Sequence, residues 1–343
     1  MADSGTTIAA ALKVDRGCFT MTAIAPLAHQ SSTLYDVRLR GERLIAKEFR
    51  KPAELYDAPL REAYALSSLD ALDVAPRLMG WVPAGALAAG QWPVVVYRRM
   101  EGEMWDRRAP TPADMAALAT LWLTVHRPAP DGTPRARGLW QGAGQMIDRS
   151  VAIMERYGHW ARSACPEARP AADLLARAAA KAQGVISTLR TAPHRALYTR
   201  TDPRFANIIR RPDGRLGMVD WEDCGISDPA EGIADLRTGP NQEDLLTADA
   251  WAAFRDPVMS ALSAQDAGLA ERVKGYELAT SLLWLDWICE HILAQAKAGP
   301  VRDWMMNTLP GEVRARRYLA RALAWPDGDL DAALAEVREM RFY

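Results

Sequence analysis

The chain has 343 residues, of which 49% are hydrophobic and 25% are charged, and its formal net charge is −1. This length and composition predict a globular protein with room for two lobes. Because basic and acidic residues nearly balance, we expect neither a nucleic acid nor an anionic membrane surface as a partner. The four cysteines lie far apart without a CxxC pair, which argues against a zinc site and a disulfide framework.

The N-terminus lacks the positively charged start of a secretory signal. No uncharged apolar segment reaches the ~18 residues that a bilayer span requires. We therefore expect a cytoplasmic protein with reduced thiols.

The first hundred residues predict an antiparallel sheet. Residues 35–40 alternate apolar and polar side chains, and after the turn at Gly41 residues 43–49 form the second strand of a hairpin. A helix is expected over residues 59–69, followed by a buried strand in the β-branched segment 92–97.

Helical patterns dominate the remainder. A helix begins at Thr111, with Pro112 in its first turn. Further helices are predicted over residues 145–157, 171–189, 249–262, 269–298 and 330–338. One hairpin interrupts them, with strands at 207–210 and 215–220 and a Pro-Asp-Gly turn. The sequence thus predicts an α+β fold with a β-rich lobe over residues 1–97, a connector over 98–103 and a helical lobe over 104–343.

The chemistry centres on Asp202, Asn207 and Asp220. A loop carboxylate such as Asp202 can orient an acceptor hydroxyl and accept its proton. The predicted hairpin brings Asn207 and Asp220 together, and their oxygens are ligands that Mg²⁺ prefers. This set therefore points to phosphoryl transfer, in which positioning and charge stabilisation do most of the work.

A nucleotide-dependent phosphotransferase also needs a cation against the phosphates. Lys47 lies in the predicted strand 43–49, and Glu62 lies fifteen residues later on the predicted helix. A strand lysine held by a helix glutamate is the arrangement that fixes an ammonium group there.

In these features the chain resembles the aminoglycoside phosphotransferase and choline kinase-like family, whose fold is related to that of protein kinases. Residues 202–207 and the run Asp220-Trp-Glu222 match its catalytic and metal-binding motifs, and Asp228-Pro229 matches a further one. The resemblance implies ATP, with GTP as the alternative, and Mg²⁺ as cofactors. It also implies that segment 94–102 is the nucleotide hinge, with contacts at Arg98 and Met100.

The sequence departs from that pattern in three places. Arg200 replaces the histidine that precedes the catalytic aspartate, and Arg204 stands where a second histidine is common. We interpret both as loop-supporting ion pairs, with phosphate contact as the alternative. The expected glycine-rich loop is residues 26–33, which contain no glycine, so Ser31 and Ser32 become the candidates for phosphate contacts.

Several residues are candidates for contacts with the substrate. Trp284, Trp287 and His291 share one face of the predicted helix 269–298 and are either core residues or an aromatic wall. Four acidic residues are either solvated or contacts for a cationic acceptor: Glu243, Asp244, Asp286 and Glu290.

These features predict a kinase that phosphorylates a hydroxyl of a small molecule and acts as a monomer or homodimer. The acceptor is either a metabolite or an antibiotic such as an aminoglycoside. The alternative is a pseudokinase that binds nucleotide and acts as an interaction module.

Overall fold

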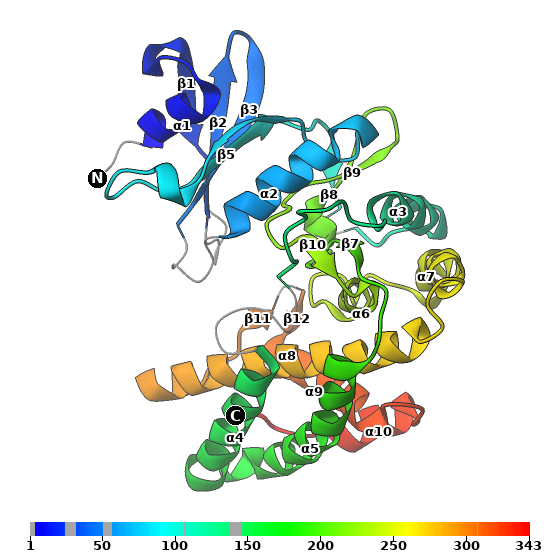
Figure 1. Cartoon of the computed structure of the whole chain (residues 1–343). Coiled ribbons are helices and arrows are strands. Elements are labelled where there is room, and N and C mark those ends of the chain that lie inside the picture. The colour runs from blue at the N-terminus through cyan, green and yellow to red at the C-terminus, as the bar shows by residue number, and fades with distance from the viewer. Residues whose placement is uncertain (1–3, 25–31, 51–56, 106–107, 138–145, 307) are drawn as a thin grey trace.

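The structure is a computed structural model that describes residues 4–24, 32–50, 57–105, 108–137, 146–306 and 308–343. Figure 1 shows a β-rich N-terminal lobe above a larger helical lobe, with each terminus in its own lobe. The predicted α+β fold with an antiparallel sheet is confirmed.

The N-terminal lobe contains a five-stranded antiparallel sheet in the order β1-β2-β3-β5-β4. Its elements are α1 (Ser4–Leu12), β1 (Phe19–Ala23), β2 (Ser32–Leu39), β3 (Glu42–Phe49), α2 (Asp57–Ser68), β4 (Leu78–Val82) and β5 (Val94–Arg98). Arg40 and Gly41 have φ values of 51° and 84° between β2 and β3. Two positive φ angles in a two-residue connection match the right-handed twist of the paired strands.

The alternation of side chains along β3 decides which residues face the other lobe. Leu44 and Ala46 join the small core that α1 covers, where Ile8 is fully buried. Phe49 faces the opposite way and joins the main core, which runs on through α2 into the helical lobe. Lys47 lies two residues before Phe49, so the period of two in a strand directs it to that inward face.

The connector at residues 98–103 packs closely on the helical lobe. Gly102 has a φ of 141°, and a Cβ atom there would come within 2.2 Å of the Arg210 carbonyl oxygen. Only glycine fits this combination of backbone angle and close approach.

Among the described residues, the helical lobe holds eight α-helices and three small sheets, and two of these sheets carry the candidate active site. Its described helices are α3 (Pro112–Val125), α4 (Met146–Ala164), α5 (Arg169–Thr191), α6 (Pro229–Thr238), α7 (Ala248–Ser263), α8 (Leu269–Ala298), α9 (Gly311–Ala324) and α10 (Leu330–Val337). Its strands are β6 (Glu103–Met104), β7 (Leu197–Thr199), β8 (Ile208–Arg210), β9 (Leu216–Met218), β10 (Gly225–Ser227), β11 (Met305–Met306) and β12 (Leu309–Pro310). The sheets β6-β8-β9 and β10-β7 flank the segment that contains Asp202.

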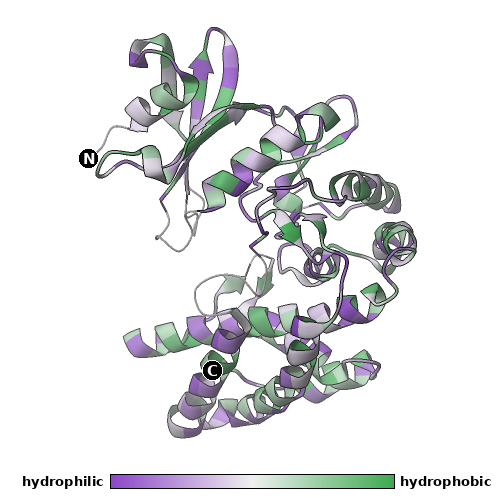
Figure 2. Cartoon of the chain, viewed as in Figure 1, coloured by the Kyte–Doolittle hydropathy of each residue, from purple (hydrophilic) through white to green (hydrophobic). Residues whose placement is uncertain are grey.

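Most helices follow the predicted periodicity, and α8 has the predicted bounds. Figure 2 shows hydrophilic and hydrophobic residues interleaved along α4 and α5, as expected for helices that bury one face. The sequence analysis did not predict α1, α6 or α9. Within the described ranges, no helix is both long and apolar enough for a membrane span.

Candidate active site

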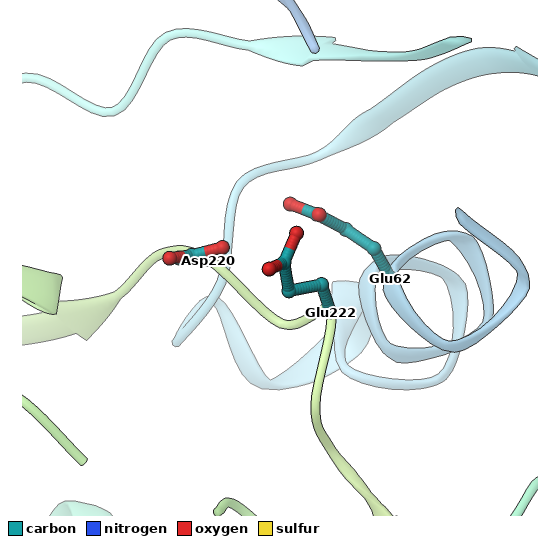
Figure 3. A group of neighbouring side chains, drawn as sticks. All are labelled: Glu62, Asp220 and Glu222. Carbon is teal, nitrogen blue, oxygen red and sulfur yellow. The ribbon is translucent and has the colours of Figure 1, made fainter. Parts of the chain in front are cut away.

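Lys47 lies at the centre of the site, with only 4% of its side chain exposed. Its Nζ lies 2.7 Å from Glu62 Oε2 and 3.0 Å from Glu222 Oε2, and it also forms an ion pair with Asp220. Figure 3 shows the three carboxylates turned toward one another, Glu62 from α2 and the other two from the segment after β9. The structure therefore brings together the predicted residues Lys47, Glu62 and Asp220, and adds Glu222.

Charge compensation fixes the protonation of this cluster. Burial would lower the pKa of Lys47, but Asp220, Glu222 and Glu62 raise it well above its usual range. Burial would likewise raise the pKa of Asp220, but Lys47, with help from Arg200 and Arg204, lowers it to about 2. The pKa of Glu62 is raised, by burial first and then by the neighbouring carboxylates against the pull of Lys47.

The hairpin of β8 and β9 places Asn207 beside Asp220. The Val219 N–H donates to the Asn207 carbonyl oxygen at 2.9 Å, directly before Asp220. The Asn207 side chain is buried, and its Nδ2 has no hydrogen-bond partner among the described residues. The amide of Asn207 also carries an oxygen, and an amide oxygen next to a carboxylate is a ligand pair that a hard cation takes.

Asp202 and Asp220 both have left-handed backbone conformations, with φ values of 58° and 63°. Such angles are uncommon for residues other than glycine and concentrate at functional sites. Asp202 Oδ1 accepts a hydrogen bond from Arg204 Nε at 2.6 Å. This contact is an ion pair within the loop, as the first of the two interpretations of Arg204 expects.

The backbone before Asp202 is anchored by His126, the residue that follows α3. The Arg200 N–H donates to His126 Nε2 at 3.1 Å, while His126 Nδ1 lies 2.8 Å from the Trp122 carbonyl oxygen. Burial lowers the pKa of His126 to about 4, which keeps the ring neutral and able to accept this bond. The Thr201 hydroxyl lies 2.5 Å from the Asp223 carbonyl oxygen and ties the loop to the segment after Asp220.

Arg200 is only 1% exposed and does not reach a surface where phosphate could bind. Its guanidinium lies 4.8 Å from the centroid of the Trp221 ring, and its side-chain nitrogens have no hydrogen-bond partner in the described part of the chain. The phosphate-contact alternative for Arg200 is therefore wrong in this structure, and the expected ion pair is replaced by a cation–π contact.

Asp202 lines a cavity of about 180 Å³ between α6, α8 and the loop of residues 200–207, which holds the candidate catalytic residue and is called the catalytic loop below. Its other lining residues are Arg137, Thr201, Arg204, Asp223, Glu231, Gly232, Asp235, Thr280, Leu283 and Trp284. With Asp202 included, four of the lining residues are acidic and two are arginines, so acidic side chains predominate in the cavity. Trp284 is the only predicted substrate candidate among the described residues that line it.

Asp235 was not predicted from the sequence, although the helix that carries it, α6, packs directly on the catalytic loop. A Cβ atom at Gly232 would lie 2.8 Å from the Arg200 carbonyl oxygen, which measures how close this packing is. Burial, together with Asp202 and Glu231, raises the pKa of Asp235 to about 7. The Asp228-Pro229 motif marks this helix, because Asp228 Oδ1 accepts from the Ala230 N–H at its first turn.

The other acidic candidates have partners within the protein. Glu243 and Arg314 are both fully buried and lie 2.6 Å apart, and Asp244 also pairs with Arg314. Asp286 accepts a hydrogen bond from Ser150 at 2.9 Å, and Glu290 pairs with Arg149. These contacts give each of the four residues a partner within the protein, and their contacts with a substrate stay a prediction.

Four further residues were predicted to contact the nucleotide, and three of them lie in the described part of the chain. Ser31 lies outside the described residues, and Ser32 pairs with Phe49 at the end of β2. The Arg98 side chain forms an ion pair with Glu42 at 2.7 Å, and its backbone N–H donates to the Arg77 carbonyl oxygen at 2.8 Å. The half-buried Met100 packs on β9, where a Cβ at Gly217 would meet its sulfur at 2.4 Å. Contacts from Ser32, Arg98 and Met100 to a nucleotide stay predictions.

A family model, described as the phosphotransferase enzyme family, matches residues 23–276. The chain belongs to this family. The matched range contains Lys47, Glu62 and the whole segment from Asp202 to Asp220. The side chains that cluster in the candidate active site therefore all lie within the part of the chain that matches the family. No curated protein matches the sequence.

Solved structures share the phosphotransferase fold at low identity. The choline kinase LicA from Streptococcus pneumoniae is 18% identical, with a TM-score of 0.56, 89% of this chain and 94% of that chain covered. A choline/ethanolamine kinase family protein from Mesorhizobium loti is 20% identical, with a TM-score of 0.53 and coverage of 93% and 92%. A spectinomycin phosphotransferase in complex with ADP and spectinomycin is 8% identical, with a TM-score of 0.57 and 94% of both chains covered.

Proposed function

We propose that this phosphotransferase is a kinase that uses Mg·ATP to phosphorylate a hydroxyl of a small molecule bound in the cavity beside Asp202. The observation that carries the proposal is the buried Lys47, which is held by Glu62 and contacts Asp220. An ammonium group fixed in this way is suited to nucleotide phosphates. GTP is the alternative donor.

In the proposed reaction, the acceptor oxygen forms a bond to the γ-phosphorus while the bond from that phosphorus to the β–γ bridging oxygen breaks. The proton of the acceptor hydroxyl passes to the Asp202 carboxylate. Arg204 occupies Oδ1 of Asp202, so we assign the proton transfer to Oδ2. Lys47 orients the phosphates, and the left-handed backbone at Asp202 fixes the carboxylate against the cavity.

Asn207 and Asp220 would hold Mg²⁺. The amide oxygen of Asn207 and the carboxylate of Asp220, whose side chain is 37% exposed, are the oxygen ligands that this end of the hairpin offers. When bound, Mg²⁺ neutralises charge on the phosphate oxygens.

The lining of the cavity favours an acceptor that carries a basic amine near its hydroxyl. Asp202, Asp223, Glu231 and Asp235 outnumber the two lining arginines. The relatives named for choline and spectinomycin indicate that this fold serves both metabolite and antibiotic acceptors, and we leave the choice between them to experiment.

The test is thermal unfolding of the full-length protein with MgATP, MgGTP and Mg²⁺ alone. A ligand that binds only the native state raises the melting temperature by mass action. We expect a shift with MgATP that Asp220→Asn abolishes, while Asp213→Asn, at an exposed hairpin aspartate, retains it. No shift with either nucleotide at millimolar concentration would refute the kinase proposal and favour the alternative of a non-catalytic interaction module.

A further inference from the structure

One narrow face of α8 is buried at Thr280 and becomes partly open to solvent toward Trp287, and aromatic residues occupy it. At about 100° per residue, Thr280, Leu283, Trp284, Trp287 and His291 fall within a stripe about 100° wide. The rest of the helix between these positions is largely buried. An open stripe of this kind is ordinarily polar.

The aromatic contacts continue beyond the helix. Trp287 is 38% exposed and stacks on His291 with ring centroids 5.7 Å apart. His291 in turn lies 4.4 Å from the Trp304 ring, next to β11, which Figure 1 shows beside α8. We call Trp287, His291 and Trp304 the α8 aromatic patch.

This patch begins at the rim of the cavity that contains Asp202. Thr280, Leu283 and Trp284 line that cavity, and Trp287 follows Trp284 by three residues on the same face. Among the described residues, the indole Nε1 atoms of Trp284 and Trp304 are buried without a hydrogen-bond partner. Both N–H groups are buried, so what the patch offers a ligand is its aromatic ring surface, which continues from the cavity along α8.

The charges around the patch argue against a polycationic acceptor lying along it. Asp286 is buried against Ser150, and Glu290 is paired with Arg149. The negative charge that is left for a ligand lies inside the cavity, whose volume of about 180 Å³ accommodates only a small head group. The patch would be superfluous for an acceptor no larger than that head group.

We propose that the acceptor is amphipathic: its hydroxylated, basic end enters the cavity beside Asp202, and an apolar or aromatic body lies on the α8 aromatic patch. This inference rests on the proposed function, because it assumes that the cavity is the acceptor site. It adds the class of molecule that the site selects.

The test uses ethanolamine and its N-butyl, N-octyl and N-(naphthylmethyl) derivatives as probes, with a polar oligo(ethylene glycol) tail of octyl length as reference. Binding to the full-length protein is measured by calorimetry in the presence of MgADP, after MgADP binding itself has been measured. Burial of each methylene on an open surface is expected to tighten binding about twofold, below the roughly fourfold of full burial. The octyl and naphthyl derivatives should therefore bind at least tenfold more tightly than ethanolamine, and the polar tail should give no gain.

Trp287→Ala should remove at least fivefold of the affinity for the tailed probes and leave that for ethanolamine unchanged. Trp92→Ala is the matched control, because Trp92 is 36% exposed and belongs to the N-terminal lobe. Affinity that does not depend on the tail, equal losses in both variants, or no binding of any probe would overturn the inference. If MgADP binds in those cases, the kinase proposal survives; if MgADP does not bind, the kinase proposal itself fails.

Discussion

Replacing Lys47 by methionine should leave a cluster of uncompensated carboxylates at the centre of the site, and this cluster should bind cations. Methionine preserves most of the side-chain volume but removes the charge that compensates Glu62, Asp220 and Glu222. Oxygen atoms of these three carboxylates lie within 4.8 Å of one another. The substitution thus leaves three like charges in a largely buried cluster without their shared partner.

The expected loss of stability is large. Removing one partner of a buried ion pair typically costs about 3–5 kcal/mol, because the other charge remains buried and uncompensated. For a chain of this size that corresponds to a decrease in melting temperature on the order of 10 °C. Lys274→Met is the matched control, since Lys274 also contacts two carboxylates but is 42% exposed, and its loss should leave the stability nearly unchanged.

Two further readouts separate charge repulsion from lost packing. Without Lys47, the folded-state pKa values of the carboxyl groups rise above their unfolded values, so the variant should regain stability as the pH falls and lose it as the pH rises. Mg²⁺ should also stabilise the variant more than the apo wild type, by about 1.4 kcal/mol at a tenfold excess over its dissociation constant. Thermal unfolding at pH 6 and pH 8, with and without Mg²⁺, measures both effects. A variant as stable as wild type, or one whose loss of stability is independent of both pH and Mg²⁺, would refute this reasoning.

Three other predictions follow from the packing around the catalytic loop. Arg200→Met should unfold at or above the wild-type temperature, because the buried guanidinium lacks hydrogen bonds among the described residues. Arg200→Ala should instead lose about 2–4 kcal/mol of stability, because it leaves a cavity over the Trp221 ring. Equal losses of stability in the two variants would contradict this reasoning. His126→Ala should cost about 1–3 kcal/mol in chemical denaturation by leaving the Arg200 N–H buried without its acceptor, and a neutral effect would count against that anchor. Asp235, whose raised pKa is about 7, contributes stability that is present below about pH 4 and is lost as the pH rises through 7, so the melting temperature of Asp235→Asn relative to wild type should increase between pH 5 and pH 8; a difference independent of pH would refute the assignment.

Local patterns were sufficient to predict the framework of the site. Strand alternation and the turn at Gly41 predicted the strand that carries Lys47, and the helical pattern predicted the helix that carries Glu62. The pairing of the two side chains was expected from the kinase arrangement of a strand lysine held by a helix glutamate. The Pro-Asp-Gly turn predicted the hairpin that carries Asn207 to Asp220. These features depend on residues that are close in the chain, where period and turn chemistry decide the outcome.

Partners distant in sequence could not be predicted in the same way. The burial of Glu243 depends on Arg314, seventy-one residues later, and the environment of Arg200 depends on how Trp221 packs. The α6 helix was missed because its apolar pattern is weak, so Asp235 was missed with it. The cue that could have found both was Asp228-Pro229, an N-cap followed by proline in the first turn.

The most direct test of the central claim is phosphate transfer from γ-labelled ATP to a panel of hydroxylated amines, followed by mass spectrometry, with Asp202→Asn beside the wild type. Asparagine preserves the shape of the side chain but cannot serve as the base. The account predicts a phosphorylated product with the wild type and at least a hundredfold lower turnover with Asp202→Asn, while both proteins bind MgATP equally. Equal turnover in the two proteins would contradict the assigned role of Asp202, and wild-type protein that binds MgATP but phosphorylates none of the panel would contradict the proposed amine-bearing acceptor.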